Sequence, residues 1–297
     1  MAVEAKTLSP ELQEEIKHWT AGNYPVWTTP GEPFPLIQSP AKLLGRADDN
    51  FIKGATAMSC IHNVIVRSLN SIYLQARNVA PTKISAITPE NRVDVETRDD
   101  FVDYAREWSI LLHMHHQGEE NCFFPEIDKA LNGKDIMERN VQQHRLFDEG
   151  VNRYDQYLEQ VRRPAKGVER VGEEKFLYGP ELCEIIESFG SILVSHLNEE
   201  IGTLLSLRAW DEKLNIHRFM EIEGEKAMKS CSLLATVEFV WHNLDAGYED
   251  GIHKDFPSAP APLKFMLKNV LWFPNRRMWR FSSCTSAMKP RPKLLYA

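Results

Sequence analysis

The chain has 297 residues, of which 43% are hydrophobic and 26% charged, the composition of an ordinary globular protein with a sizeable core. Its net charge of −7 gives no general electrostatic reason to expect binding to nucleic acid or to an anionic membrane. No stretch approaches the roughly 18–20 apolar residues of a membrane span, and the polar start of the chain carries no apolar signal run. The five cysteines include no Cys-x-x-Cys pair, so we expect no thiolate zinc site, no disulfide framework and a reducing, cytoplasmic location.

Residues 1–46 are predicted to form an arm that packs on the surface of a folded domain. Ser9 and Pro10 indicate the start of a short helix that ends near His18. Five prolines between positions 25 and 40 exclude regular helix from the remainder of the arm. The aromatic residues among these prolines favour packing over a free linker.

Residues 47–209 contain four long helical patterns, in which inward-facing residues recur at alternating steps of four and three. The expected helices span about 48–78, 99–131, 134–161 and 180–207. Asn132-Gly133 ends the second helix, and a glycine-containing loop over 162–179 separates the third from the fourth. The pattern predicts an all-α fold built on an up-down-up-down four-helix bundle.

A histidine occupies one inward position on each of these helices: His62, His115, His144 and His196. On the second and fourth helices a glutamate, Glu119 or Glu200, follows the histidine by four residues and so shares its face. Because successive helices run in opposite directions, depth can be counted from one shared end of the bundle. At 1.5 Å per residue, the four histidines lie roughly 14–21 Å from that end. Four imidazoles and two carboxylates therefore converge at one level.

Such a cluster predicts bound metal. Buried, charged carboxylates without a counter-charge cost about several kcal/mol each, whereas metal ions bind ionised carboxylates and neutral imidazoles. Imidazole and carboxylate together suit iron, manganese or zinc, and six protein ligands exceed what one tetrahedral zinc site uses. Two metal ions bridged by Glu119 and Glu200 fit the number of ligands better.

The same residues resemble the hemerythrin-like, or HHE cation-binding, domain. The family pattern is a lone His, then HHxxEExxxFP, another His and finally HxxxE. Here it corresponds to His62, the run His115–Pro125, His144 and the segment His196–Glu200. The resemblance covers about residues 48–209 and implies a non-haem di-iron centre, in a four-helix bundle, that interacts with oxygen. Manganese or zinc is the less favoured occupant.

The expected metal ligands are His62, His115, Glu119, His144, His196 and Glu200. Glu119 and Glu200 would bridge the two ions. His116 and Glu120 are turned about 100° from the inward line, so we interpret them as flanking residues, with roles as alternate ligands or as partners of ligands kept open. His113 is treated in the same way.

Two positions depart from the oxygen-carrying hemerythrins. Those carriers have two histidines four apart on the third helix, and here the second place is Asp148. Their bridging aspartate on the fourth helix is replaced by Glu200, one residue nearer its histidine. We interpret Asp148 as either a ligand or a partner of a ligand histidine. Fewer imidazoles favour oxygen activation, iron sensing or redox chemistry over reversible oxygen carriage.

Residues 210–297 are expected to form a helical and irregular extension. A fifth helix is predicted over about 221–244, followed by a proline-containing loop and a short apolar segment over 263–273. The basic, aromatic residues at 276–281 and the basic tail at 289–293 could contact RNA or lipid, but we favour a cap packed on the bundle. His217, His242 and His253 are interpreted as structural, and Cys122 as small core packing near the site.

The sequence thus predicts a non-haem di-iron protein that binds or activates O2. We favour an oxygen-dependent redox enzyme acting on a small molecule, because arms at both ends would shape a pocket that a bare carrier does not need. The alternative is a non-catalytic iron or oxygen sensor, store or carrier. A hydrolase with two zinc or manganese ions is weaker because no separate general base stands out, and a bundle without metal is the remaining alternative. Neither nucleic acid nor membrane is expected as a partner.

Overall fold

The structure is a computed structural model that describes residues 7, 9–19, 26–27, 32–164, 175–210 and 214–297. Parts of the N-terminal arm and most of the loop expected over 162–179 lie outside these residues. The described part is mostly helical, as predicted, and adds one antiparallel pair of two-residue strands. Among the described residues, none of the helices combines the length and apolar character that crossing a membrane requires.

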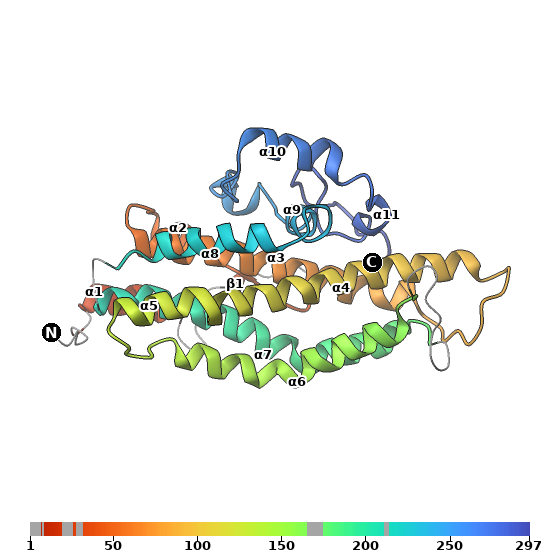
Figure 1. Ribbon diagram of the computed structural model, residues 1–297, viewed down its shortest axis with the longest axis horizontal. Helices are drawn as coiled ribbons and strands as arrows, with labels where there is room; N and C mark the ends of the chain where they lie inside the picture. Colours follow the sequence, from red (N-terminus) through yellow and green to blue (C-terminus); the bar gives the residue numbers. More distant parts are fainter. Residues whose placement is uncertain (1–6, 8, 20–25, 28–31, 165–174, 211–213) are drawn as a thin grey trace.

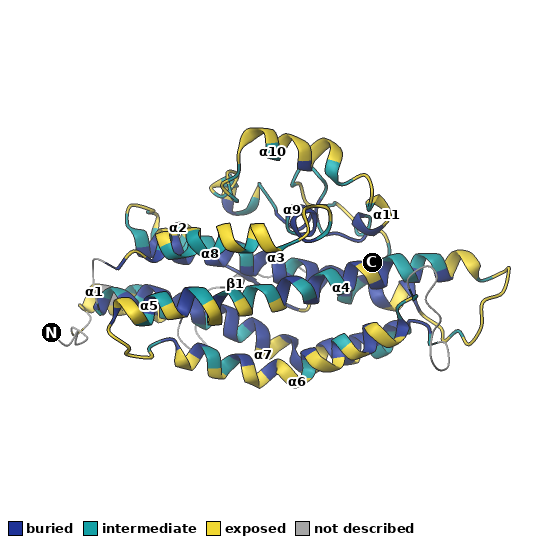
Figure 2. Cartoon of the chain, in the orientation of Figure 1, coloured by how far each residue is buried: buried dark blue, intermediate teal, exposed yellow. Residues whose placement is uncertain are grey.

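Four long helices lie side by side and form the body of the molecule (Figure 1). They are α3 (Asn50–Val79), α4 (Arg92–Gly118), α6 (Glu138–Val161) and α7 (Gly179–Ser206). Helix α3 packs on α4 and α7, and α6 packs on the same two helices from the other side. Their buried faces meet in one apolar core, while exposed residues line the outer faces (Figure 2). Burial of these apolar stripes is the main force that assembles the four helices.

Trp108 on α4 occupies the centre of this core. Its indole N–H donates to the Ile65 carbonyl oxygen on α3, over 3.0 Å. Its ring stacks on Phe189 of α7 and meets Tyr154 of α6 edge-on, with centroid separations of 5.8 and 5.0 Å. One side chain therefore contacts all three neighbouring helices. It sets their spacing about two helical turns before His115 on α4.

The second predicted helix differs from the structure at both ends. It begins at Arg92 instead of Asp99, because the Asn91 side chain accepts from the Thr88 N–H and donates to the Ala86 carbonyl, which organises the turn before it. It also does not continue regularly to Leu131. A π-helical turn, η2 (Glu119–Phe123), joins α4 to α5 (Phe124–Ala130). Pro125 lacks an N–H and crowds the preceding turn, which explains the wider turn.

The N-terminal arm runs along the surface of α3 and α7. Its elements are α1 (Pro10–Ile16), η1 (Lys17–Trp19), β1 (Val26–Trp27), β2 (Leu36–Ile37) and α2 (Pro40–Leu44). Two asparagines on α3, two turns apart, hold the arm. Asn63 accepts from the Ile37 N–H and donates to the Ile37 carbonyl, and Asn70 does the same for Phe34. The arm thereby gains sheet-like pairing from side-chain amides.

The C-terminal extension consists of short elements. They are η3 (Leu207–Ala209), α8 (Ile216–Ser230), η4 (Leu233–Val237), α9 (Glu238–Trp241), η5 (Tyr248–Gly251), α10 (Ala261–Met266), η6 (Leu267–Leu271) and α11 (Arg276–Trp279). The single fifth helix predicted over 221–244 is wrong, because the backbone becomes extended at Cys231 and Ser232. This break lets Val237 and Trp241 turn inward, where they pack on Leu267.

Candidate metal centre

The structure brings the six predicted ligand residues together inside the four long helices. The side chains of His62, Glu119, His144, His196 and Glu200 are buried, and His115 is partly buried. His62 comes from α3, His115 from α4, His144 from α6, and His196 and Glu200 from α7. Glu119 is the first residue of η2. Each of the four helices therefore contributes to one buried cluster.

One group of potential ligand atoms lies between α3, α4 and α7. It consists of His62, His115, Glu119 and Glu200, whose donor atoms all lie within 4.8 Å of one another. The two Nε2 atoms of His62 and His115 are 3.0 Å apart. Glu119 Oε1 lies 3.2 Å from His115 Nε2, and Glu200 Oε2 lies 3.4 Å from His62 Nε2. The group can hold one metal ion.

A second group shares Glu119 with the first and includes a residue that the sequence did not place inward. It consists of His116, Glu119, His144 and His196, again within 4.8 Å of one another. Glu119 Oε2 lies 3.5 Å from His144 Nε2. Glu200 Oε2 lies 4.0 Å from His196 Nε2, so Glu200 is close to this group as well. The geometry thus places side by side two groups that could each hold a cation, with Glu119 common to both.

The hydrogen bonds around the cluster determine which ring nitrogens carry protons. His62 Nδ1 donates to the Leu197 carbonyl oxygen over 2.8 Å. His144 Nδ1 contacts Glu120 Oε1 at 2.6 Å, and His196 Nδ1 contacts the amide oxygen of Gln143 at 3.2 Å. Carbonyl and carboxylate oxygens only accept, so Nδ1 of each ring carries the proton. In the neutral imidazoles Nε2 is then an unprotonated donor atom for metal, the arrangement common in metal sites.

The contact between His144 and His196 is therefore unfavourable without a cation. Their Nε2 atoms are 3.1 Å apart, and in the neutral rings neither carries a hydrogen that could bridge them. Two lone pairs facing each other at this distance repel. A metal ion held by both nitrogens would remove this repulsion, because each lone pair would then bind the cation.

Burial sets the charges of the cluster. It lowers the pKa of His115, His116 and His196 well below the usual value for histidine, and neighbouring imidazoles act in the same direction. Burial also raises the pKa of Glu119 well above its usual value, with a further contribution from Glu200 beside it. The low-dielectric surroundings thus favour neutral imidazoles, which are the form that binds metal.

Several polar atoms in the cluster form no hydrogen bond with any described residue. Both carboxylate oxygens of Glu119, both of Glu200, and Nε2 of His116 are buried without a hydrogen bond. Buried polar groups almost always form hydrogen bonds. Five buried oxygen and nitrogen atoms without a hydrogen bond in one place therefore indicate that a binding partner is missing. A divalent cation satisfies carboxylate oxygens and imidazole nitrogens together. The residues therefore fit the metal ions that the sequence predicts.

Three other predicted positions have different surroundings. Asp148 is exposed on α6, outside both groups, because the inward line steps from His144 by three to Phe147 instead of by four. The interpretation of Asp148 as a ligand is therefore wrong. Glu120 lies outside both groups, and its Oε1 contacts His144 Nδ1 at 2.6 Å. This is the contact expected of a partner of a ligand histidine, one of the two roles considered for Glu120. His113 is directed away and contacts Asp155 at 2.6 Å.

His116 could have been found from its spacing. It precedes Glu119 by three residues, and residues three apart on a helix share a face just as residues four apart do. The sequence interpretation followed only the four-residue pairs His115/Glu119 and His116/Glu120. The Nε2 of His116 points into the second group, and its ring stacks on His144 with a centroid separation of 4.1 Å.

Helix α8 of the C-terminal extension covers the π-helical turn beside the cluster. It contacts η2, α4 and α5. A Cβ atom at Gly118 would lie 2.2 Å from Oε1 of Glu223, so the carboxyl group of Glu223 rests on a position where any side chain would intrude. Three residues further on, Lys226 Nζ lies 3.0 Å from Cys122 Sγ. Cys122 is thus half-buried under α8 and not part of the apolar core.

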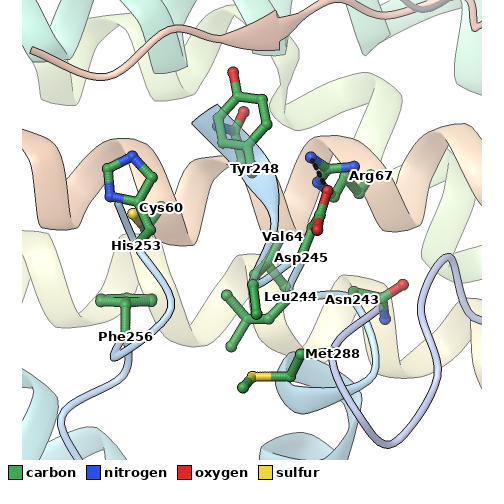
Figure 3. A pocket seen from close by; sticks show the side chains of 12 residues that line it. Cys60, Val64, Arg67, Asn243, Leu244, Asp245, Tyr248, His253, Phe256 and Met288 are labelled. Atoms are coloured by element: carbon green, nitrogen blue, oxygen red, sulfur yellow. Dashed lines mark ion pairs between the residues drawn. The ribbon is translucent and has the colours of Figure 1, made fainter. Parts of the chain in front are cut away.

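The hollows between α3 and the C-terminal extension are separate from this cluster. The one in Figure 3 has a volume of about 20 Å³, the size of a single water molecule, and contains the ion pair between Arg67 and Asp245. A neighbouring open hollow of about 390 Å³ shares Cys60, His253 and Phe256 with it. Neither is lined by a residue of the two ligand groups.

Comparisons with known proteins agree with this geometry. Residues 57–207, about half of the chain, match the family model of the hemerythrin HHE cation-binding domain. The chain is also 27% identical to the dimeric xanthone biosynthesis cluster protein R11 of Cryptosporiopsis sp. (strain 8999), over 94% of this chain and 93% of that protein. No solved structure gives a significant match. The matched range contains both ligand groups, and the chain belongs to the hemerythrin HHE cation-binding domain family.

Proposed function

We propose that the protein binds two iron ions and uses them in an oxygen-dependent redox reaction on a small molecule. The observation that carries the proposal is the pair of adjacent ligand groups that share Glu119. His62, His115, Glu119 and Glu200 would hold one ion, and His116, His144, His196 and Glu119 the other. We further infer that the four long helices form the up-down-up-down bundle of the hemerythrin type, with the two ions at its centre.

Iron is favoured by the donor set. Seven residues supply five imidazoles and two carboxylates, so each ion would have four protein ligands with Glu119 shared, and an iron ion that takes six ligands would keep positions open for oxygen. Imidazole and carboxylate together are the usual ligands of non-haem iron that leaves coordination positions open. A di-iron centre supplies oxygen binding and electron transfer when it is bound.

The residues around the cluster orient the imidazoles and exclude water. The Leu197 carbonyl, Glu120 and Gln143 hold three of the rings by their Nδ1 atoms. Phe147 lies against His196 and His116, with centroid separations of 5.6 and 5.4 Å. Aromatic packing keeps the local dielectric low, which strengthens every electrostatic interaction in the site.

The choice of redox chemistry over oxygen carriage has a different basis from the one suggested by sequence. The absent histidine at position 148 is compensated by His116, so the centre is not poor in imidazoles. Support comes instead from the relative, which is named for a xanthone biosynthesis cluster and aligns along both terminal extensions of this chain. Helix α8 from the C-terminal extension packs on η2, where it would shape the surroundings of a bound substrate.

The first test is metal analysis of protein purified without chelators, with visible spectra after anaerobic reduction and reoxygenation. We expect about two irons per chain and absorption bands that change with oxygen. Loss of oxygen from solution in the presence of a reductant, at a rate that continues beyond one equivalent, would support an enzyme. A reversible spectrum without continued consumption would support the sensor, store or carrier instead. Protein that neither retains nor takes up a transition metal would refute the proposal.

A matched pair of variants tests the second ligand group. His116→Gln removes a donor atom from that group, and His113→Gln changes a histidine three residues earlier that is bonded to Asp155. We expect His116→Gln to lose about one iron per chain relative to the parent protein, and His113→Gln to keep both. Equal iron content in the two variants would remove His116 from the proposed site.

A further inference from the structure

The end of the chain is basic although the protein is acidic. Residues 256–297 contain eight lysines and arginines and no aspartate or glutamate, whereas the whole chain has 35 basic and 42 acidic residues. Part of this segment packs on the bundle: Arg277 and Arg280 pair with Asp100 of α4, and Phe281 is fully buried. The net charge of −7 therefore hides a strong asymmetry along the chain.

Helix α10 and the turn η6 leave an apolar surface exposed. Met266, Val270 and Phe273 follow one another at steps of four and three, with Phe265 beside them, and we call these four residues the α10 patch. Their exposed fractions are 37%, 45%, 57% and 63%, in that order. On the opposite side Leu267 is buried against Val237 and Trp241, in a small core of its own. The exposed side faces away from the long helices (Figures 1 and 2).

Cations border this patch. Lys264, Lys268 and Arg276 lie within or just after α10 and η6. The guanidinium group of Arg276 lies over the Phe273 ring, 4.5 Å from its centroid. Lys268 is exposed and forms no ion pair with any described residue. A short helical segment with bulky apolar side chains on its outer face and cations at its edge is the pattern of helices that lie in a membrane interface.

We propose that the α10 patch binds the surface of an anionic phospholipid membrane. Phe265, Met266, Val270 and Phe273 would enter the boundary between headgroups and acyl chains, and the bordering cations would contact lipid phosphates. Lipid explains the patch better than RNA does, because Met and Val side chains gain little from stacking on bases. Arg277 and Arg280 are already paired with Asp100 and Glu96 of α4. This proposal replaces the expectation that the protein has no membrane partner.

The test is sedimentation of the full-length, metal-loaded protein with vesicles of phosphatidylcholine, with and without phosphatidylserine. We expect binding to the vesicles that contain phosphatidylserine and a decrease as salt is raised. The double variant Phe265→Ser/Phe273→Ser should weaken binding at least about tenfold, since two large apolar side chains are lost from the interface. Lys264→Glu/Lys268→Glu should weaken it at least about twentyfold, because each basic residue contributes about fivefold.

Matched controls use exposed residues of the same kind on the bundle. Val93→Ser/Leu146→Ser removes apolar residues that are 75% and 66% exposed, and Lys53→Glu/Lys129→Glu reverses two exposed lysines. These variants should bind as the parent protein does. No binding, equal binding to both vesicle types, or equal losses in patch and control variants would overturn the proposal. Loss of RNA binding or of self-association in the patch variants, without an effect on vesicles, would assign the patch to that partner instead.

Discussion

Two of the buried clusters that combine glutamate with histidine differ in how the carboxylate is satisfied. Glu249 in the C-terminal extension accepts from the Ser39 N–H and the Ser39 hydroxyl, and its Oε2 lies 2.6 Å from His253 Nε2. Glu119 at the centre of the helices has no hydrogen bond to either oxygen. The protein supplies hydrogen-bond donors to the first carboxylate, which ties the N-terminal arm to the C-terminal extension. The second needs a partner that the protein does not provide.

This contrast distinguishes the Glu249 cluster from the Glu119 cluster without reference to family. Buried carboxylates with a full set of donors stabilise a fold, whereas buried carboxylates left without donors lower its stability until a cation binds. Two residue pairs with the same spacing, His115/Glu119 and Glu249/His253, therefore have opposite roles. The hydrogen bonds that the carboxylate oxygens accept, more than the residue types, distinguish the two pairs.

The largest expected effect comes from replacing each of the two glutamates, Glu119 and Glu249, by glutamine. Glu119→Gln should abolish binding of both metal ions and leave the metal-free chain as stable as the parent or more stable, by about 1–2 kcal/mol, because a buried acid is removed. Glu249→Gln should retain both ions and destabilise the metal-free chain by about 1–3 kcal/mol, because the Ser39 N–H and hydroxyl lose a carboxyl group that accepts from both. Metal content, and urea unfolding with and without chelator, measure both effects.

Bound metal should also stabilise the parent protein. At a free ion concentration about a thousandfold above Kd, linkage predicts a gain of about 4 kcal/mol in the free energy of unfolding. Glu119→Gln should show no such gain, and Glu249→Gln should show all of it. If chelator leaves the stability of the parent and of both variants unchanged, the contrast between the two clusters is lost.

The inward line of histidines could be predicted from sequence because it depends on helical periodicity alone. His62, His115, His144 and His196 follow the same steps of four and three as the apolar residues around them, and 3.6 residues per turn then fixes their face. The fold class follows from the same pattern. His116 and Asp148 were misjudged because each lies at the margin of a stripe, where a step of three or four decides which residue faces inward.

Other features depend on contacts between distant parts of the chain. The break at Cys231 and Ser232 places Val237 and Trp241 on Leu267, a contact that no local pattern in 221–244 encodes. The position of Glu223 beside Gly118 likewise results from how α8 docks on η2. Only the π-helical turn had a local signal, since Pro125 lies inside an otherwise helical pattern.

A second prediction concerns the pH dependence of the metal-free centre. Burial holds the pKa of His115, His116 and His196 below the value of about 6.5 that they have when unfolded, so the unfolded chain gains more protons as pH falls through that value. The raised pKa of Glu119 acts in the opposite direction, because the folded chain keeps a proton that the unfolded chain loses above its usual pKa. Within the centre three groups outweigh one, so the contribution of the centre to folding should weaken with acid.

The expected loss of stability in chelator between pH 6.5 and 5.5 is about 2 kcal/mol. His116→Gln should reduce this loss, since one of the three buried imidazoles is gone. His113→Gln should increase it slightly, because the hydrogen bond to Asp155 raises the pKa of His113 and so favours folding at lower pH. Urea unfolding at several pH values measures these slopes. Equal slopes in the two variants would contradict the assignment of His116 to the buried cluster.

The smallest effect should come from two glycines that test how the C-terminal extension contacts the centre. In Gly118→Ala the new Cβ would meet Glu223 Oε1, whereas in Gly224→Ala it would meet nothing within 4 Å. Alanine favours a helix over glycine by about 0.5–1 kcal/mol, so Gly224→Ala should be stabilised by that amount. In Gly118→Ala the same gain should be offset by displacement of the flexible Glu223 side chain, which leaves stability nearly unchanged.

The visible spectrum of the metal-loaded protein distinguishes the two variants more sharply than stability does. Gly118 directly precedes Glu119, and α8 packs on the turn that Glu119 begins, so a displaced Glu223 changes the electrostatic field at the Glu119 carboxyl group. Gly118→Ala should therefore shift the absorption bands of the oxidised centre, and Gly224→Ala should not. Removal of the carboxyl charge by Glu223→Gln should shift the bands even with Gly118 intact. Identical spectra for all three variants would mean that the extension stabilises the bundle without tuning the centre.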